Sequence, residues 1–324
     1  MSALCRAACR SASFLAAIAV AASASAQPYP AKPVKIITSG AGNVGDIVAR
    51  RVASFLHERW GQPVIVENRP GVGQTIATTA VARATPDGYT LGLNDRTALA
   101  VAPSLWKNLS YDPLKDLAPI TLVATTPLIL VGHPSVPAND LAQFIEYLRR
   151  PTATHLFTSG PSTGNHLANE LLKQAARVNI ENVHYNGSPP AVTGLLAGET
   201  KGGFMLVPLI LPHVKAGRVK AYAITSGKRF AGTPDIPSVT ELGMPQLESD
   251  YWLALVAPAG TPAGVVDKLN RDIVDVMKTP AMREFLLAQG GEPAYGSPAE
   301  LSSFVGNETA KWKKVIDAAG IRMD

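Results

Sequence analysis

Two glycine-rich turns carry residue types that could bind or react with a small molecule. The first, Gly40–Gly45 (GAGNVG), follows an apolar run and opens an amphipathic segment. In dinucleotide-binding folds a G-x-G-x-x-G turn holds a pyrophosphate at a helix N-terminus, and an acidic residue about 20 positions later binds the ribose. Glu67 lies near that position. The turn could also receive any other anion, carboxylates included, so an NAD-dependent oxidoreductase is one alternative and a receptor for a small anion is another.

The second turn, Gly160–Gly164 (GPSTG), matches the G-x-S-x-G turn that presents a nucleophilic serine in esterases. A triad would need an acid and then a histidine after Ser162. No aspartate lies between Ser162 and His213, and no histidine follows His213. The other interpretation is a hydroxyl-rich turn in which Ser162 and Thr163 cap a helix or hold an anion.

The histidines and cysteines do not indicate a metal site. The histidines are His57, His133, His155, His166, His184 and His213. None has metal-ligand spacing to another histidine or to a cysteine, so we expect no metal. Only His166, which directly follows the second turn, is placed to contact a ligand.

Four polar loops follow predicted strands in the same sense, at 39–46, 94–97, 159–165 and 185–189. In doubly wound sheets, ligands bind beyond the carboxyl ends of the strands. The loops are rich in Gly, Ser, Thr and Asn, which supply N–H and hydroxyl donors. They contain neither a paired acid and base nor an activated nucleophile. This chemistry favours binding without conversion, and we expect a protein that is not an enzyme.

These loops need an alternating α/β framework to position them. The first predicted strands are 34–38, 64–67 and 89–93, with helices at 46–60 and 73–84 between them. A second set has strands at 128–131, 156–158, 183–185, 204–207 and 221–225, with helices at 141–148, 166–176 and 190–197. The end of the chain has a strand at 252–256 and helices at 263–278, 281–289 and 298–319. The order predicts parallel, doubly wound sheets, and because one final strand cannot build a third sheet, the end of the chain should rejoin the first domain.

The first 26 residues have the features of a secretory signal peptide. Arg6 and Arg10 precede the apolar stretch Phe14–Ala22, and Ala24–Ala26 is an A-x-A cleavage site. The apolar stretch is shorter than the roughly 20 residues of a membrane-spanning helix. We therefore expect cleavage after Ala26 and export to the periplasm. Free nicotinamide cofactor is scarce there, which weakens the oxidoreductase alternative.

Composition excludes further classes of function. Both cysteines, Cys5 and Cys9, precede the expected cleavage site, so the mature chain cannot use a thiol as nucleophile or metal ligand. The formal net charge of +5 is mild, and the Lys and Arg residues form no cluster of the kind that binds nucleic acid. We expect no cofactor and no nucleic-acid partner.

Motifs along the whole chain resemble the receptors of tripartite tricarboxylate transporters, also called Bug proteins. The motifs are Val64–Gly71 (VIVENRPG), Pro86–Leu91 (PDGYTL), Tyr111–Pro113 with Lys115 and Asp116, His166–Ala168 with Glu170 and Leu171, Tyr185–Ser188 (YNGS), Pro212–Gly217 (PHVKAG), Pro234–Val239 (PDIPSV), Ala257–Pro262 (APAGTP), and Trp312 with Ala319 and Gly320. Together they extend over essentially all of residues 27–324. Many ordered motifs at consistent spacing are more specific than either glycine turn.

The resemblance implies a periplasmic binding protein of type II, with two doubly wound α/β domains joined by a hinge. One domain would comprise residues 27–124 and 249–324, and the inserted domain residues 125–248. Such a receptor captures a small organic anion, usually a carboxylate, in the cleft between its domains. We expect a monomer that delivers the anion to a membrane permease of the tripartite tricarboxylate type, with a membrane sensor kinase as the alternative partner.

The resemblance also implies the ligand-binding loops. The residues expected to bind are Ser39, Gly40, Gly42, Asn43 and Asp46 in the first loop, Asn94, Arg96 and Thr97 in the second, Ser159, Ser162, Thr163 and His166 in the third, and Tyr185 and Ser188 in the fourth.

This chain departs from the family pattern at several positions. The family's first loop usually carries Pro-Phe and then Pro-Gly-Gly, whereas this chain has Thr38 and Ser39 followed by Ala41–Val44. Met205 stands where an acidic residue often faces the cleft, and Arg96 adds a cation. Because an ammonium would require an acidic partner, we expect an anion with an apolar part rather than an amino acid, with Met205 among the residues that contact it.

Overall fold

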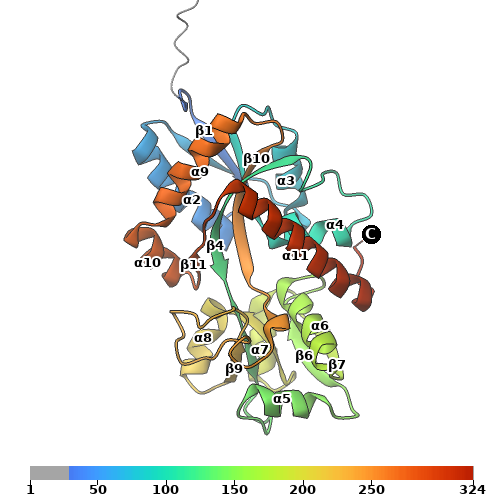
Figure 1. Ribbon diagram of the computed structural model, residues 1–324. Helices are drawn as coiled ribbons and strands as arrows, with labels where there is room; N and C mark the ends of the chain where they lie inside the picture. Colours follow the sequence, from blue (N-terminus) through green and yellow to red (C-terminus); the bar gives the residue numbers. More distant parts are fainter. Residues whose placement is uncertain (1–28, 324) are drawn as a thin grey trace, which may run out of the picture.

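The computed structural model describes residues 29–323, which form two α/β domains joined by crossing strands (Figure 1). The expected signal peptide, residues 1–26, lies outside the described residues. The cleft between the domains, described below, is where the four polar loops meet.

The first domain contains a six-stranded sheet in the order β11-β4-β10-β3-β1-β2. Its strands are β1 (Val34–Thr38), β2 (Val64–Asn68), β3 (Thr90–Asp95), β4 (Leu117–Thr126), β10 (Tyr251–Pro258) and β11 (Glu292–Pro293). The second domain contains a five-stranded sheet in the order β7-β6-β8-β5-β9. Its strands are β5 (Leu128–Gly132), β6 (Thr154–Thr158), β7 (Ile180–His184), β8 (Gly202–Leu206) and β9 (Lys220–Ile224).

Helices cover both faces of each sheet. The helices of the first domain are α2 (Val44–Trp60), η1 (Val72–Gln74), α3 (Thr75–Ala82), η2 (Thr97–Val101), α4 (Ala102–Leu105), α9 (Ala263–Met277), α10 (Pro280–Ala288) and α11 (Pro298–Ala319). Those of the second domain are α5 (Leu141–Leu148), α6 (Gly164–Ala176), α7 (Ser188–Leu196) and α8 (Val207–Lys215), and η3 (Pro245–Leu247) precedes the return to the first domain.

The sheets are mixed, which corrects the expectation of parallel sheets. β1 pairs in parallel with β2 and β3, but β10 runs antiparallel to both β3 and β4. In the second sheet β5 is antiparallel to β8 and β9. The cause in the first sheet is the path of the chain. Strand β4 runs out of the first domain and β10 runs back into it beside β4, so the two strands point in opposite directions.

The end of the chain rejoins the first domain, because β10 and β11 lie in its sheet. The chain passes from one sheet to the other at Pro127, between β4 and β5, and returns just before β10. The division at 124/125 and 248/249 is compatible with these sheets and stays a proposal.

Local signals explain the helix ends nearest the cleft. Asn43 caps α2, and its side chain accepts the backbone N–H of Asp46 at 2.9 Å. At the other end of the domain, Ser297 and Glu300 form a reciprocal capping box that starts α11. Gly320 ends α11 with φ 66°, a left-handed conformation that glycine adopts without a Cβ clash.

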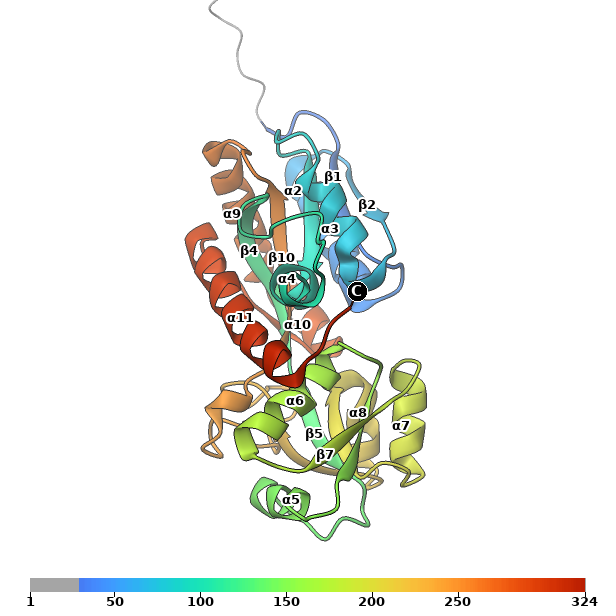
Figure 2. The ribbon, with the colours of Figure 1, turned by 90° about the vertical axis from the view of Figure 1, so that its right-hand side faces the viewer.

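Helix α11 connects the two domains on one side of the crossing strands. Both ribbon views place its C-terminal half beside α6 (Figures 1 and 2). The Nε2 amide of Gln174 in α6 donates to the carbonyl of Val315 in α11 at 3.0 Å. One apolar cluster accordingly continues from Trp312 and Trp252 of the first domain to Leu167 of the second. The domains are thus held together through this apolar contact as well as through the chain itself.

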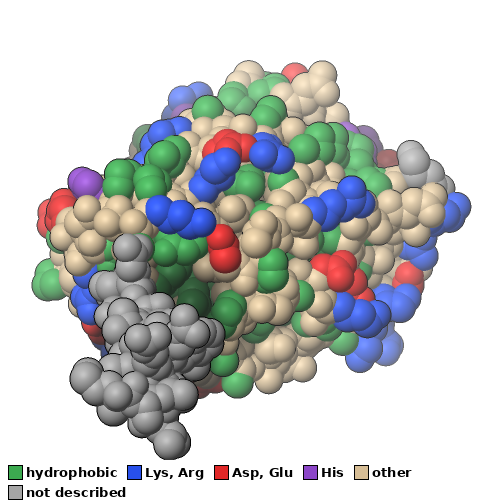
Figure 3. Space-filling view, turned by 90° about the horizontal axis from the view of Figure 1, so that it is seen from above, with side chains coloured by type: hydrophobic (Ala, Val, Ile, Leu, Met, Phe, Trp, Pro, Cys, Tyr) green, Lys and Arg blue, Asp and Glu red, His purple; other side chains and the backbone are tan. Residues whose placement is uncertain are grey.

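The surface is mixed in charge over the face seen in Figure 3, where Lys and Arg alternate with acidic and apolar side chains. Ion pairs of the first domain join Lys35 to Glu67 at 2.6 Å and Lys32 to Asp87 at 3.2 Å. Within residues 29–323, the structure contains no helix with the length and apolar character needed to span a bilayer.

Candidate functional site

The cleft between the domains contains two neighbouring compartments. A narrow compartment of about 190 Å³ lies mainly against the second domain, and a wide one of about 530 Å³ lies against the first. Leu206 and Tyr251 line both compartments and mark where they meet. A small molecule could therefore occupy one compartment and extend into the other.

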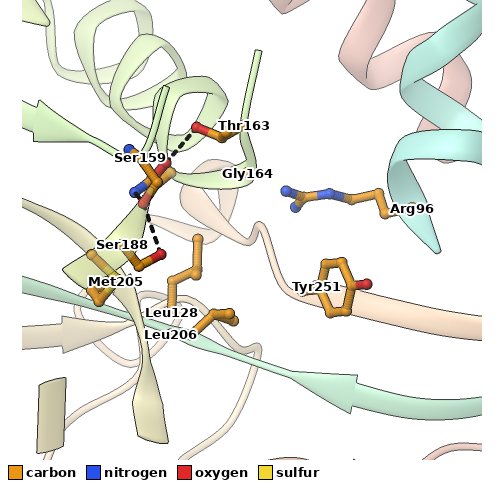
Figure 4. A pocket seen from close by; sticks show the side chains of 10 residues that line it. Arg96, Leu128, Ser159, Thr163, Gly164, Ser188, Met205, Leu206 and Tyr251 are labelled. Carbon is orange, nitrogen blue, oxygen red and sulfur yellow. Dashed lines mark hydrogen bonds between the residues drawn. The ribbon is translucent and has the colours of Figure 1, made fainter. Parts of the chain in front are cut away.

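The narrow compartment combines one cation, several hydroxyl groups and an apolar floor (Figure 4). It is lined by Arg96, Leu128, Ser159, Thr163, Gly164, Asn165, Ser188, Met205, Leu206 and Tyr251. Polar donors at one side and apolar side chains at the other are what a carboxylate with a hydrocarbon part requires.

Arg96 enters the narrow compartment from the first domain. It follows β3, its side chain is only 1 % exposed, and its guanidinium points toward Gly164 at the start of α6 (Figure 4). Its Nη1 donates to the carbonyls of Ser249 at 2.7 Å and Asp250 at 3.1 Å, just before β10. The guanidinium also stacks on Trp312, with Cζ 4.5 Å from the ring centroid. These contacts fix one side of the guanidinium and leave Nη2 directed at the compartment.

Burial raises the free energy of the charged Arg96 side chain, so an anion beside it is stabilising. Burial lowers the pKa of the Arg96 guanidinium, an effect that the carboxylates of Glu308 and Asp95 oppose. Neither carboxylate lies within 4.0 Å of the guanidinium nitrogens. The Nε atom is buried without a hydrogen-bond partner among the described residues. An arginine remains charged at neutral pH, so the site retains a poorly compensated cation.

The N-terminus of α6 adds a second source of positive potential. No side chain caps this 13-residue helix at Thr163, and its first turn contains no acidic residue. A Cβ atom placed on Gly164 would lie 2.8 Å from Arg96 Nη2, which shows how closely the cation approaches the helix end. The partial positive charge of a helix N-terminus and a guanidinium repel each other, and an anion beside both offsets that repulsion. The arrangement therefore favours an anionic ligand.

A hydrogen-bond network holds the Ser159–Asn165 turn in shape. Asn165 accepts the backbone N–H of Ser159 at 3.1 Å and the Thr163 hydroxyl at 2.6 Å, and it donates to Ser159 Oγ at 2.8 Å. Ser159 Oγ and Ser188 Oγ are 2.9 Å apart, which joins the third loop to the fourth. Of two hydroxyl groups bonded to each other, one proton stays free to donate to a ligand.

His166 supports this turn from behind the cleft. Its Nδ1 accepts the backbone N–H of Ser162 at 2.9 Å, which requires the neutral ring with its proton on Nε2. Burial, with a contribution from the neighbouring His184, lowers the pKa of His166 to about 4. The ring therefore acts as a hydrogen-bond acceptor for the backbone and not as a base for the serine.

We expect His166 to stay neutral down to about pH 4 in the folded protein, as ¹⁵N–¹H NMR of the imidazole would report. The unfolded pKa of histidine, near 6.5, is higher than the folded one, so its contribution to stability is complete above pH 6.5 and is lost as the pH falls toward 4. Wild type should lose roughly 2–3 kcal/mol more over this range than His166→Gln, as measured by urea unfolding. A ring that titrates near pH 6.5 would contradict this prediction.

The wide compartment has a different chemistry. It is lined by Ser39, Gly40, Asn43, Val44, Pro70, Gly71, Gly73, Gln74, Asp95, Thr97, Leu206 and Tyr251. Asp95 accepts the Tyr251 hydroxyl at 2.9 Å and the backbone N–H of Ala98 at 3.0 Å. Burial raises the pKa of the Asp95 carboxyl. An acidic side chain thus does face the cleft, at a position that the sequence interpretation did not include.

The structure brings most of the expected site residues to the cleft but not all. Arg96, Ser159, Thr163, Ser188 and Met205 line the narrow compartment, and Ser39, Gly40, Asn43 and Thr97 line the wide one. The residues that line neither are Gly42, Asp46, Asn94, Ser162, His166 and Tyr185.

Those six residues have structural partners instead. Asp46 accepts the backbone N–H of Gly42 at 2.9 Å and so closes the first loop on itself. The buried Asn94 donates to Thr78 at 2.7 Å. The Tyr185 hydroxyl bonds Glu199 at 2.9 Å. For the remaining two, the backbone N–H of Ser162 donates to His166, and the buried Ser162 hydroxyl has no partner in the described part of the chain.

The two enzymatic alternatives lack their required groups. Glu67, the candidate for a ribose, is bound by Lys35 and Arg69, each at 2.6 Å. His166 Nδ1 is occupied by the backbone of Ser162 and cannot take a proton from the Ser162 hydroxyl. Neither glycine turn therefore has the geometry of the enzyme that its sequence pattern suggested.

Some lining residues carried no signal in the sequence. Tyr251 opens β10, more than 150 residues after the loop it faces, and Leu128 and Leu206 read as ordinary core residues. Gln74 lies in the left-handed region with φ 61°, a conformation that a local pattern of apolar residues does not indicate. Gly164 and Asn165 belong to the expected third loop but not to the residues expected to bind.

Two α/β domains around a cleft that presents a buried guanidinium beside a helix N-terminus are typical of a solute-binding protein. A profile described as "Tripartite tricarboxylate transporter family receptor" matches residues 48–321. Protein BugT of Bordetella pertussis is 34% identical over 313 residues, which cover 96% of each chain.

Solved structures agree. The periplasmic binding protein BugD is 33% identical and superposes with a TM-score of 0.72, covering 91% of this chain and 100% of its own. An R. palustris protein solved with adipate is 30% identical with a TM-score of 0.76, and the coverage is again 91% and 100%. MatC from Rhodopseudomonas palustris, solved with bound malate, is 29% identical with a TM-score of 0.72, covering 89% and 100%.

The chain belongs to the tripartite tricarboxylate transporter receptor family, whose members are periplasmic solute-binding proteins. The resemblance in the motifs and the two-domain expectation are confirmed. The similar proteins are binding proteins and not enzymes, which overturns the oxidoreductase and esterase alternatives.

Proposed function

We propose that this protein captures a small organic carboxylate in the cleft between its domains and delivers it to a membrane permease of the tripartite tricarboxylate type. The observation that carries the proposal is the Arg96 guanidinium, which points across the cleft at the uncapped N-terminus of α6. A carboxylate beside both accepts hydrogen bonds from Nη2, from the free hydroxyl of the Ser159 and Ser188 pair, and from backbone N–H groups of the helix.

The similar proteins support a carboxylate, since one was solved with adipate and another with malate. The apolar floor of Leu128, Met205 and Leu206 then contacts the hydrocarbon part of the ligand. We further propose that the protein acts as a monomer in the periplasm after cleavage at Ala26. Rotation of the domains over the ligand would present both domains in a fixed relation to the permease.

Native mass spectrometry of protein purified from the periplasm tests export and ligand class together. The expected result is a chain that begins at Gln27 and carries a bound carboxylic acid, which is released on denaturation and identified by its exact mass. A co-purified sugar, peptide or cationic solute would contradict the proposed ligand class. An N-terminus at Met1 would contradict the proposed cleavage after Ala26.

Delivery to the permease is tested in cells. Deleting the gene should abolish uptake of the identified acid at micromolar concentration, and supplying the receptor alone should restore it. If the deletion leaves uptake unchanged, a role in transport is excluded and a role in sensing is the alternative.

A further inference from the structure

The two compartments of the cleft carry opposite charges. Among the described residues that line the narrow compartment, Arg96 is the only charged side chain. Among those that line the wide compartment, Asp95 is the only one, and no Lys or Arg is present there. Tyr251, which lines both, donates its hydroxyl to Asp95. A ligand that occupies both compartments therefore meets a cation at one end and an acid at the other.

The N-termini of α2 and α6, at the first and third loops, differ in the same direction. In α2 the Asn43 side chain accepts the backbone N–H of Asp46, and the Asp46 carboxylate accepts that of Gly42. Asp46 thus places a negative charge in the first turn of α2 and offsets its partial positive charge. Helix α6 has neither a side-chain cap nor an acid in its first turn. Of these two helices, only α6 begins beside Arg96 without an acid in its first turn.

A second carboxylate in the wide compartment would be disfavoured. It would lie near Asp95 with no cation in the lining to separate the two negative charges, and like charges at short distance in a partly desolvated cleft repel strongly. Both groups bonded to Asp95, the Ala98 N–H and the Tyr251 O–H, are donors, so Asp95 acts as an acceptor. Each carboxylate oxygen can accept a further hydrogen bond, which a donor on the ligand would supply.

We propose that the ligand has a single carboxylate, held by Arg96 and the first turn of α6, and that its other end is a hydrogen-bond donor, a hydroxyl or an ammonium group, that meets Asp95 in the wide compartment. The inference rests on the proposed function. The inference goes beyond the proposed function because it excludes dicarboxylates as the preferred ligands. It also revises the expectation drawn from Met205, because Asp95 supplies the acid that this position lacks.

Calorimetric titration with a matched series of straight-chain acids tests the proposal. Each chain length from four to eight carbons is presented with a carboxylate at one end and with methyl, hydroxyl, ammonium or carboxylate at the other. At the best length, the hydroxyl or the ammonium form should bind at least about tenfold tighter than the dicarboxylate. Whichever of these two forms binds more tightly identifies the donor group on the ligand. If the dicarboxylate or the methyl form binds best, the inference is overturned and the proposed function stands. If no acid of the series binds, the proposed function itself fails, and the inference fails with it.

A charge-neutral variant of the acid provides an independent check. In Asp95→Asn, the ratio between the dissociation constants of the dicarboxylate and the donor-bearing acid should fall by about tenfold or more. The matched control is Asp267→Asn, which removes the same charge from an exposed position on α9 and should leave the ranking unchanged. An unchanged ranking in Asp95→Asn would remove Asp95 from ligand selection.

Discussion

Replacing Arg96 by lysine is expected to weaken binding of the best acid in the series about 10- to 150-fold. The guanidinium does two things at once, because Nη1 holds the carbonyls of Ser249 and Asp250 while Nη2 faces the anion position. An ammonium group keeps the charge but has no planar fork, so it cannot donate to the two carbonyls and to the ligand at the same time. Losing one charge-assisted hydrogen bond costs roughly 1.5–3 kcal/mol, which corresponds to the expected range.

Stability should fall as well, because the same side chain packs on Trp312. A stacked, buried cation contributes about 2 kcal/mol, and the carbonyls it leaves would be unsatisfied. We therefore expect Arg96→Lys to lose roughly 2–4 kcal/mol in urea unfolding. Calorimetry at a temperature where the variant is fully folded separates the two effects. A dissociation constant equal to that of wild type would mean that Arg96 supports the hinge and does not bind the ligand.

The second large effect is expected from Gly164→Ala, which should weaken binding about tenfold or more while the fold is retained. The new methyl group would lie 2.8 Å from Arg96 Nη2, so the guanidinium must move away from the anion position or the methyl must occupy part of it. Arg96 cannot move freely because its other contacts are fixed. Alanine is the better helix former by up to about 1 kcal/mol, so α6 itself should not be weakened.

Gly306→Ala is the matched control for this substitution. Gly306 lies within α11, and a Cβ placed there meets no heavy atom within 4 Å. It should leave affinity unchanged and raise stability slightly. Equal affinities in Gly164→Ala and wild type would show that the start of α6 is not where the carboxylate binds. Loss of folding in Gly164→Ala alone, seen by circular dichroism, would instead contradict the local geometry described for this turn.

Arg96 and Gly164 act on one point from opposite domains. If both predictions hold, the double variant should lose less affinity than the sum of the single losses, since each removes the same contact. A fully additive double variant would place the two residues in separate parts of the site.

Elements with strong local signals could be predicted from the amino-acid sequence. Helix α5 has the expected bounds, Leu141–Leu148, because its apolar residues repeat at helical spacing after the capping Asp140. Helix α11 also has the expected bounds, since its capping box and final glycine mark both ends. The glycine turns were located correctly, as loops between a strand and a helix, because their φ angles and caps depend on residues close in the chain.

Elements with weak local signals were missed. Strand β4 contains Pro119 and small residues, β11 has two residues and is defined by pairing with β4, and α8 contains Pro212 within the helix. Each exists because of partners distant in sequence and not because of its own periodicity.

The chemistry of the cleft depends on contacts between residues that are distant in sequence. Arg96 bonds carbonyls that are 153 and 154 residues away, and Tyr251 bonds Asp95 across 156 residues. The sequence predicted Arg96 as a ligand-binding residue in the second loop, but only folding buries its guanidinium between α11 and the returning strand and directs it at α6. Composition and spacing establish which donors, acceptors and charges the loops contain, but the position of each in the cleft depends on long-range packing, and that packing selects the groups that a ligand can reach.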